Sequence, residues 1–345
     1  MKIAIVTDAW DPQINGVVIT LKKTTKILKD WGHTIEYITP QGFHSIPCPT
    51  YPDIRLALFP NRKVFKNLDD FQADAVHIAT EGPLGMAARK WCIKNNFPFT
   101  TSYHTQFPEY VRLRAPIPLS VSYAWLRRFH GNAQRTMVPT KTQLKRLQER
   151  GFKNAVIWSR GVDTELFKPG DKSFLKEQRP VFMYMGRVAV EKNIEAFLEL
   201  DLPGTKYVVG DGPDLEMLKG KYQDTVFTGF KFGEELATYL AAADVFVFPS
   251  RTDTFGLVLL EALACGVPVA AYPVTGPIDV IENGVTGCLD EDLGKAAEDA
   301  LQLDPETCRE YALKNSWEEA TKQFLSHICD RSDSYMVSDS LLKRL

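Results

Sequence analysis

Asp253 and Glu261, two acidic residues eight positions apart, are the side chains of this sequence whose types and spacing most directly suggest chemistry. Asp253 lies in a polar loop after an apolar run, and Glu261 lies inside the helix that the next residues predict. The N-terminus of that helix, at Phe255, Gly256 and Leu257, offers unpaired N–H groups and about half a positive charge. The segment therefore suits a bound diphosphate, with a carboxylate on either side of it to contact hydroxyl groups.

Both carboxylates also have an ordinary interpretation, as an Asp at a helix start and a Glu on a helix. Glu261, however, lies among leucine and alanine residues, where a carboxylate needs a polar partner. We therefore favour a functional interpretation of the pair.

Two basic residues, Arg187 and Lys192, form a second group. They follow the apolar segment 181–185, which predicts a buried strand, so both lie at the carboxyl end of a strand. Fixed cations at that position can neutralise a diphosphate leaving group without a magnesium ion. On its own this group would be interpreted as solvated loop charges. Together with the acidic pair it indicates a binding site.

Other kinds of chemistry find no support in the sequence. The six histidines are scattered, and neither a His-Glu-x-x-His pattern, a Gly-x-Ser-x-Gly turn nor a Walker A loop occurs. In the segment 210–213, proline stands where a dinucleotide fingerprint would continue into a helix, which disfavours a nicotinamide enzyme. Asp290, Glu291 and Asp292 fit a loose metal pattern but are better interpreted as a helix N-cap. We therefore expect no metal and no bound cofactor.

Length and composition are those of a two-domain globular protein. The chain has 345 residues, of which 44% are hydrophobic and 24% charged, enough for a sizeable core in each of two domains. The six cysteines lie far apart, so we expect reduced thiols rather than disulfides or a zinc site. No apolar run is long enough for a signal peptide or a membrane span, and we expect a cytoplasmic protein.

The net charge of −2 conceals an uneven distribution. Residues 1–170 hold 24 Lys and Arg against 13 Asp and Glu, whereas residues 171–345 hold 17 against 30. We infer that the first half meets an anionic partner or surface, although drift between two domains would also produce the difference. No stacking platform accompanies the basic residues, so we do not expect nucleic-acid binding.

Short β-branched runs alternate with helical patterns along the chain. Strands are predicted at 2–7, 34–39, 75–79, 99–103, 135–138, 155–158, 181–185, 206–209, 225–228, 245–248 and 267–271. Helices are predicted between them at 17–31, 84–95, 141–150, 193–200, 234–243, 256–264 and 293–303. The alternation restarts after a Pro-Gly break at residues 169 and 170, which predicts two doubly wound α/β domains with parallel sheets. Ligands of such sheets bind at the carboxyl ends of strands, so we expect the site in a cleft between the domains.

Together these segments resemble glycosyltransferase family 4, whose members are retaining, nucleotide-sugar-dependent enzymes of GT-B fold. The resemblance covers nearly the whole chain and rests on the acidic segment and on residues 15–18, 159–167, 186–193, 209–213 and 227–230. It implies two Rossmann-like domains that face a central cleft. We expect an acceptor-binding domain at 1–170, a nucleotide-sugar-binding domain at 178–315, and a last helix within 316–345 that crosses back to the first domain.

The resemblance also implies a role for each matching residue. In the first domain, Gly16 would let the first loop approach the phosphates closely, because no Cβ intervenes. His104, which follows the strand at 99–103, would lie beside the reacting sugar. Gly210 and Phe230 would line the pocket of the nucleobase.

The acidic and basic groups receive roles in the same way. Glu261 would hold the ribose, and Asp253 would contact hydroxyls of the donor sugar. The N–H groups at 255–257 would bind the diphosphate, and Arg187 and Lys192 would stabilise it as it leaves. Similar enzymes retain the anomeric configuration by front-face attack, in which the leaving phosphate oxygen accepts the acceptor's proton and closing of the domains assembles the site.

One position departs from the common pattern. The family usually has glutamate at both ends of its acidic pair, whereas this chain has Asp253, as in a bacterial subgroup of α-mannosyltransferases and glycolipid synthases. The donor is therefore left open between GDP-mannose, UDP-glucose and UDP-glucuronate.

The first domain suggests an acceptor and a location. Basic and aromatic residues interleave through 110–130, with Trp125 and Phe129 among them, and Lys22, Lys26 and Lys29 add a basic stripe at helical spacing. This pattern suits a membrane interface, although solvated helix faces would also produce it. We expect a membrane lipid such as diacylglycerol or a lipid-linked glycan as acceptor, and peripheral attachment to the anionic inner face of the cell membrane.

Two other functions stay open. A sugar-nucleotide epimerase can share this fold and would release free nucleotide and an altered sugar without any acceptor. A non-catalytic nucleotide-sugar-binding protein is suggested only by Asp253, at the position of the usual glutamate.

Overall fold

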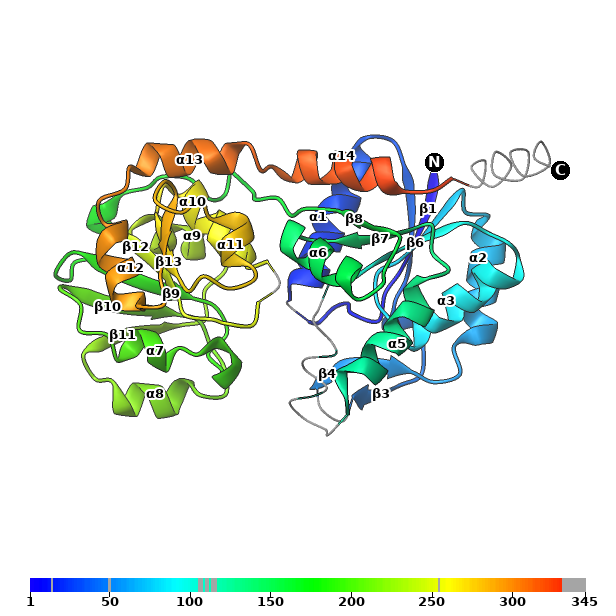
Figure 1. The fold of residues 1–345 in the computed structure, drawn as a ribbon, viewed down its shortest axis with the longest axis horizontal. Helices are drawn as coiled ribbons and strands as arrows, with labels where there is room; N and C mark the ends of the chain where they lie inside the picture. Colours follow the sequence, from blue (N-terminus) through cyan, green and yellow to red (C-terminus); the bar gives the residue numbers. More distant parts are fainter. Residues whose placement is uncertain are drawn as a thin grey trace. The chain divides into compact units, whose positions relative to one another are not determined.

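The computed structural model describes residues 1–13, 15–48, 51–104, 108, 112, 117–253 and 255–330. These residues form two compact units (Figure 1). The first contains Met1–Ser159 and the described residues from Ala320 on, and the second contains Arg160–Glu319. The first unit thus ends before the break expected at residue 170, and the segment 160–170 belongs to the second unit.

A six-stranded sheet in the order β2-β1-β5-β6-β7-β8 forms the centre of the first unit. Every neighbouring pair is parallel. The strands are β1 (Lys2–Val6), β2 (Thr34–Ile38), β5 (Ala75–Ile78), β6 (Phe99–Ser102), β7 (Arg135–Val138) and β8 (Ala155–Ile157). Between two parallel strands the chain must return to the edge of the sheet where it started, so a helix follows most of the strands and packs on one or the other face.

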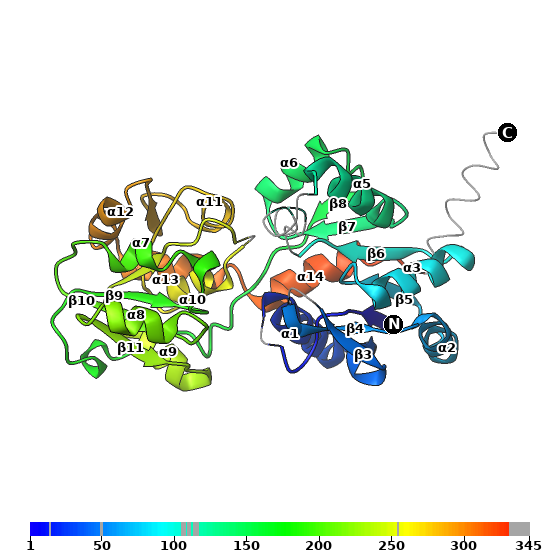
Figure 2. The ribbon, with the colours of Figure 1, turned by 90° about the horizontal axis from the view of Figure 1, so that it is seen from below.

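Helices cover both faces of this first sheet. They are α1 (Gly16–Asp30), α2 (Asn61–Phe71), α3 (Pro83–Lys94), α5 (Leu119–His130) and α6 (Lys141–Glu149). Leu21 of α1 packs with Ile3 and Ile5 of β1, whereas Phe129 of α5 packs in the core that contains Ala4. Successive residues of a strand point to opposite faces, so α1 and α5 lie on opposite sides of the sheet (Figure 2).

The last described helix, α14 (Trp317–His327), completes the α1 side of this core. Phe324 is fully buried there, with its ring centroid 4.7 Å from that of Trp158 and 4.9 Å from that of His77. The segment 320–328 thus supplies apolar side chains to a core whose other members lie within the first 159 residues.

An antiparallel hairpin, β3 (Ser45–Cys48) and β4 (Tyr51–Ala57), stands outside the main sheet. Ser45 pairs with Ala57 and Ile46 with Leu56. Neither this hairpin nor α2 is among the predicted elements. The hairpin leads directly into α2 through the segment 58–60.

The second unit is also built on a six-stranded parallel sheet, in the order β11-β10-β9-β12-β13-β14. Its strands are β9 (Val181–Met185), β10 (Thr205–Val209), β11 (Thr225–Gly229), β12 (Val245–Phe248), β13 (Val269–Ala271) and β14 (Gly287–Leu289). Its helices are α7 (Glu195–Leu198), α8 (Leu215–Lys221), α9 (Gly233–Ala241), α10 (Leu257–Ala264), α11 (Pro277–Val280), α12 (Leu293–Ala300) and α13 (Pro305–Leu313). Side chains of α9, α10 and α13 pack on one face, and those of α7, α8 and α12 on the other. The predicted pair of doubly wound α/β domains is confirmed.

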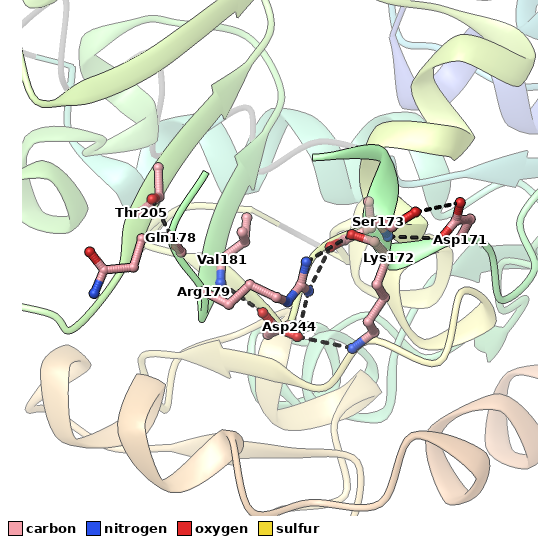
Figure 3. A network of polar contacts seen from close by, with 9 residues as sticks. Asp171, Lys172, Ser173, Gln178, Arg179, Val181, Thr205 and Asp244 are labelled. Carbon is pink, nitrogen blue, oxygen red and sulfur yellow. Dashed lines mark hydrogen bonds and ion pairs between the residues drawn. The ribbon is translucent and has the colours of Figure 1, made fainter. Parts of the chain in front are cut away.

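A polar network fixes the chain where it enters the second sheet (Figure 3). Asp244, just before β12, accepts hydrogen bonds from the backbone N–H of Val181 at 2.7 Å and from the Arg179 guanidinium at 2.7 Å. Lys172 Nζ lies 3.1 Å from the same carboxylate. The network therefore ties the polar segment before β9 to the amino ends of two neighbouring strands, leaving their carboxyl ends for a site.

Candidate functional site

A close ion pair joins two of the predicted site residues. Lys192 ends a short 3-10 turn (Val190–Lys192) after β9, and Asp253 lies in the loop after the neighbouring strand β12. Lys192 Nζ lies 2.7 and 2.9 Å from the two carboxylate oxygens of Asp253, and both side chains are largely buried. The cation and the carboxylate expected at the site are therefore brought together at the carboxyl ends of two adjacent strands.

Arg187 lies in the same group of loops, and its side chain is half exposed. Its Nη1 is 3.9 Å from Oε1 of Glu191. The hydroxyl of Tyr184, on β9, donates a hydrogen bond to the carbonyl of Arg187 at 2.8 Å. Burial raises the pKa of Tyr184 well above its ordinary value, with the carboxylates of Asp253 and Glu191 adding to the shift, so this phenol stays a hydrogen-bond donor. Tyr184 thereby holds the loop that carries the guanidinium.

Two further hydrogen bonds tie the turn of Lys192 to the loop of Asp253. Asn193 has a positive φ of 53° and donates from Nδ2 to the carbonyl of Pro249 at 3.0 Å. The hydroxyl of Thr252 donates to the carbonyl of Glu191 at 3.3 Å. Asn193 lies in the motif segment 186–193, but its contact and that of Thr252 were not among the expectations from the sequence. An asparagine after a turn, where a left-handed conformation is tolerated, was the available signal.

Gly210 packs against the loop of Arg187. A Cβ at Gly210 would lie 1.8 Å from the carbonyl oxygen of Gly186, and a Cβ at Gly212 would lie 2.1 Å from that of Val188. The backbone N–H of Val188 donates to the carbonyl of Asp211 at 2.9 Å. The glycines of the segment 210–212 therefore allow two loop backbones to touch, a structural reason for glycine that is separate from the predicted contact with a nucleobase.

The predicted anion site at the start of α10 has the expected local structure. Gly256, with a φ of 79°, precedes the first helical residue, Leu257, and Phe255 is buried. The first N–H groups of a helix lack partners within the helix, and the macrodipole favours negative charge at this end. Glu261 is half buried in the second turn of α10. Thr254 lies outside the described residues.

A glycine that sequence reasoning missed supports the loop before α10. Gly276 has a φ of 99°, and a Cβ there would lie 3.1 Å from the carbonyl oxygen of Asp253 and 3.3 Å from that of Phe255. Glycine fits this position well, because it tolerates a positive φ and has no Cβ to crowd the two carbonyl oxygens. The loop after β13 therefore fixes the backbone on which Asp253 stands.

Arg251 fixes the other side of the same loop. Its guanidinium carbon lies 3.6 Å from the ring centroid of Tyr272, and Nη2 is 3.0 Å from Oε2 of Glu291. Asp292 accepts a hydrogen bond from the backbone N–H of Lys295 at 3.1 Å and caps α12. The N-cap interpretation of the segment 290–292 is confirmed.

Phe230 lies apart from this group, directly after the edge strand β11. Its ring is exposed and stacks on that of Phe232, with centroids 6.2 Å apart. Both aromatic side chains are at the carboxyl end of the second sheet, as the predicted base-binding role requires. Of these two rings, only that of Phe230 was expected from the sequence.

Two of the predicted site residues belong to the first unit. His104 lies two residues beyond β6, and its ring centroid is 5.8 Å from that of Trp158. Gly16 is the first residue of α1 rather than part of a loop, because Asn15 caps the helix by accepting from the N–H groups of Val17 and Val18. Both residues lie at the carboxyl edge of the first sheet.

The basic and aromatic features that the structure describes in the first unit lie on both sides of its sheet. Lys22, Lys26 and Lys29 are exposed on α1, and Lys22 is paired with Asp11 at 2.6 Å. Trp125 lies on α5, on the opposite side of the sheet. Of the segment 110–116, all but residue 112 lies outside the described residues. Throughout the described part of the chain, no helix is long and apolar enough to cross a membrane.

Models of two protein families match the two parts of the chain. The model described as Glycosyltransferase Family 4 matches residues 14–166, and the model described as Glycosyl transferases group 1 matches residues 179–303. The chain is 30% identical to a GDP-mannose-dependent alpha-mannosyltransferase of Corynebacterium glutamicum, over 96% of this chain and 89% of that protein. It is 26% identical to an alpha-monoglucosyldiacylglycerol synthase of Streptococcus pneumoniae, over 100% and 88%.

The fold is similar to that of solved glycosyltransferases. The sucrose-phosphate synthase from Thermosynechococcus elongatus superimposes with a TM-score of 0.76 at 23% identity, covering 94% of this chain and 97% of that one. This likeness bears on the fold, and it confirms the predicted GT-B architecture of two Rossmann-like halves.

Proposed function

The chain belongs to glycosyltransferase family 4, and from that premise we propose that it transfers a hexose from a nucleoside diphosphate sugar to an acceptor hydroxyl, with retention of the anomeric configuration and without a metal ion. The observation that carries the proposal is the Lys192–Asp253 pair beside Arg187 and the N-terminus of α10. A diphosphate needs positive charge as its bond to the sugar breaks, and Arg187, Lys192 and the N-terminus of α10 supply it.

Each residue of the site has a step in this reaction. Arg187 and Lys192 stabilise the diphosphate as it leaves, and the backbone at 255–257 holds it beforehand. Asp253 orients Lys192 and accepts hydrogen bonds from hydroxyls of the sugar. Glu261 holds the ribose, and Phe230 contacts the base. The acceptor's proton passes to the departing phosphate oxygen, so the protein supplies placement and charge.

Relatives suggest the order in which donors are tested. The protein of Corynebacterium glutamicum is named for GDP-mannose, which makes GDP-mannose the first donor to assay and UDP-glucose and UDP-glucuronate the next. The protein of Streptococcus pneumoniae is named as a synthase of a glucosylated diacylglycerol. A membrane lipid is therefore our proposed acceptor, reached by reversible attachment of the first unit to an anionic membrane.

Incubation of the purified chain with each radiolabelled donor and dispersed diacylglycerol tests the proposal. We expect a labelled glycolipid with the donor's anomeric configuration, and equal activity with and without a chelator, because Arg187 and Lys192 take the place of a metal ion. Loss of activity with the chelator and its return with manganese would contradict the metal-independent part. Free nucleotide with an epimerised sugar and no acceptor product would instead identify an epimerase.

A further inference from the structure

An exposed apolar corner lies where the β3–β4 hairpin meets α2, at the lower edge of the first unit in Figure 1. Phe59 is 95% exposed, and its chain neighbour Leu58 is 41% exposed. Ile46, which pairs with Leu56 in the hairpin, is 47% exposed. Phe59 also has a positive φ of 49°. The hairpin and the segment that leads into α2 therefore expose three large apolar side chains.

This arrangement is unfavourable for a protein that meets only water. Single exposed apolar residues are common, but a cluster with an almost wholly exposed aromatic tip usually marks a contact surface. A bulky residue in the left-handed region adds backbone strain, which persists where the surrounding structure enforces it. The neighbouring Pro60 and the hydrogen bond from the N–H of Leu58 to the carbonyl of His44, at 2.8 Å, hold the corner in place.

Three basic side chains lie in the same two elements as the corner. Arg62 and Lys63 are exposed in the first turn of α2, and Arg55 is exposed on the hairpin, where it donates to the carbonyl of Ser45 at 2.7 Å. Between residues 40 and 68 the sequence contains a single acidic residue, Asp53. Apolar side chains within a basic rim fit an anionic lipid surface, into which the apolar groups insert while the charges remain among the headgroups.

The corner lies at the carboxyl edge of the first sheet, the edge at which we expect the acceptor to bind. Lys2, at the start of β1, has its Nζ 4.9 Å from the ring centroid of Phe71, at the end of α2. The end of α2 is thus at the amino edge of the sheet, and its start, beside Phe59, is at the carboxyl edge. His104 follows β6 at that same edge.

We propose that this corner, with Phe59 at its tip, is the surface through which the first unit inserts into an anionic membrane. The inference deepens the proposed function, on which it rests, by assigning the membrane contact to particular residues. The other candidate for a membrane contact is α5. Its Trp125 is 39% exposed and stacks on Phe129, with ring centroids 6.0 Å apart. The ring of Trp125 is already partly used in packing, whereas that of Phe59 is not covered.

Sedimentation with phosphatidylcholine vesicles, with and without phosphatidylglycerol, tests this assignment on the full chain. Phe59→Ser should weaken binding to the anionic vesicles about tenfold, since it removes a large apolar side chain from the contact. Arg62→Gln should weaken it about fivefold at low salt and have little effect at high salt. Ile93→Ser is the matched control, because Ile93 is 42% exposed on α3, away from the corner, and Trp125→Ser tests α5.

The outcomes separate this surface from the proposed reaction. Binding of Phe59→Ser equal to that of the wild type, an equal loss in Trp125→Ser, or no binding by the wild type would each overturn the assignment. Transfer to a short-chain, water-dispersed diacylglycerol needs no membrane, and Phe59→Ser should keep it in full with an unchanged melting temperature. Absence of that transfer in the wild type would defeat the proposed function, whatever the vesicles show.

Discussion

The ammonium of Lys192 lies between the two carboxylate oxygens of Asp253, at 2.7 and 2.9 Å, and so joins the loop after β9 to the loop after β12. These residues are 61 positions apart in the chain. The carboxylate holds the ammonium at one position before any donor arrives, which reduces the reorganisation needed when a diphosphate binds. Asp253 therefore positions a cation, in addition to the contact with the sugar that we propose for it.

Neutralising either partner should reduce turnover strongly. We expect Lys192→Met and Asp253→Asn each to lower kcat by about 100-fold or more, the size found when one preorganised charge-stabilising group is removed. Lys219→Met is the matched control, because Lys219 is an exposed lysine of α8 with a loose partner 3.8 Å away. Steady-state assays with saturating donor measure the effect. Wild-type turnover in Lys192→Met would remove the lysine from the mechanism.

Substitutions of Asn193 should affect the protein in two ways, through the left-handed backbone at this position and through the lost side-chain hydrogen bond. Asn193→Ala loses the hydrogen bond to Pro249 and places alanine at a φ of 53°, which costs about 1–2 kcal/mol in the left-handed region. Asn193→Gly loses the hydrogen bond alone. We expect kcat/KM and the melting temperature to fall in the order wild type, Gly, Ala. If the two variants behave alike, the amide and not the left-handed backbone is what matters.

Gly210→Ala should disturb donor binding through the loop of Arg187. Its Cβ would lie 1.8 Å from the carbonyl oxygen of Gly186, so one of the two loops must move. We expect a raised KM for the donor and a lower melting temperature. Gly220→Ala is the control, because Gly220 lies in α8 with no atom within 4 Å of an added Cβ. That change should be neutral or stabilise the protein by up to about 1 kcal/mol. Equal effects at both positions would contradict the argument from close packing.

Asp8 should make the stability of the fold depend on pH. Burial raises its pKa from 3.8 to about 6, although the N–H groups of Leu84 and Gly85 and the hydroxyl of Thr80 donate to the carboxylate. The unfolded chain loses this proton near pH 4 and the folded chain near pH 6, so the free energy of unfolding falls as the pH rises through that window. The upper bound of the loss is about 3 kcal/mol, from about two units of pKa.

Asp8→Asn removes the titrating group and tests this dependence. The stability of Asp8→Asn relative to the wild type should increase between pH 4 and pH 7, as measured by urea denaturation at each pH. A difference that is constant across this range would show that the carboxyl of Asp8 titrates alike in the folded and unfolded chains.

Glu261 and His104 should affect different kinetic constants. The ribose lies far from the reacting carbon, so Glu261→Ala should chiefly raise the KM for the donor. His104, expected beside the reacting sugar, should chiefly contribute to kcat, because interactions made mainly in the transition state appear there. Initial rates over a range of donor concentrations separate the two. Full turnover of His104→Ala with saturating donor would show that its assigned role is wrong.

Much of the fold was predictable because its parallel strands are buried on both faces and read as short β-branched runs. The hairpin and α2 were not. Pro47 and Pro52 argue against strands in that segment, since proline cannot donate to a ladder, and an outlying hairpin tolerates them. α2 is largely polar and buries only Val64 and Leu68 completely. Its apolar residues were thus too few to show the repeat of three to four positions that predicts a helix.

The contacts within the site could be predicted less well than its residues. The sequence indicated Arg187, Lys192 and Asp253, but it assigned Lys192 and Asp253 separate tasks. Their pairing depends on β9 and β12 being neighbours, although β10 and β11 separate them in sequence. Sheet order is a tertiary property that periodicity does not contain. The contacts of Asn193 and Gly276 could not be predicted for the same reason.

The burial of Phe324 beside Trp158 and His77 has a consequence for the order in which the protein is made. A ribosome releases the whole of the first sheet, and then the whole of the second, before it releases the segment 320–328 that fills the first core. The unit that is synthesised first is therefore the unit whose core closes last. Until then the α1 side of the nascent sheet keeps an open apolar face, which is the kind of surface that chaperones cover.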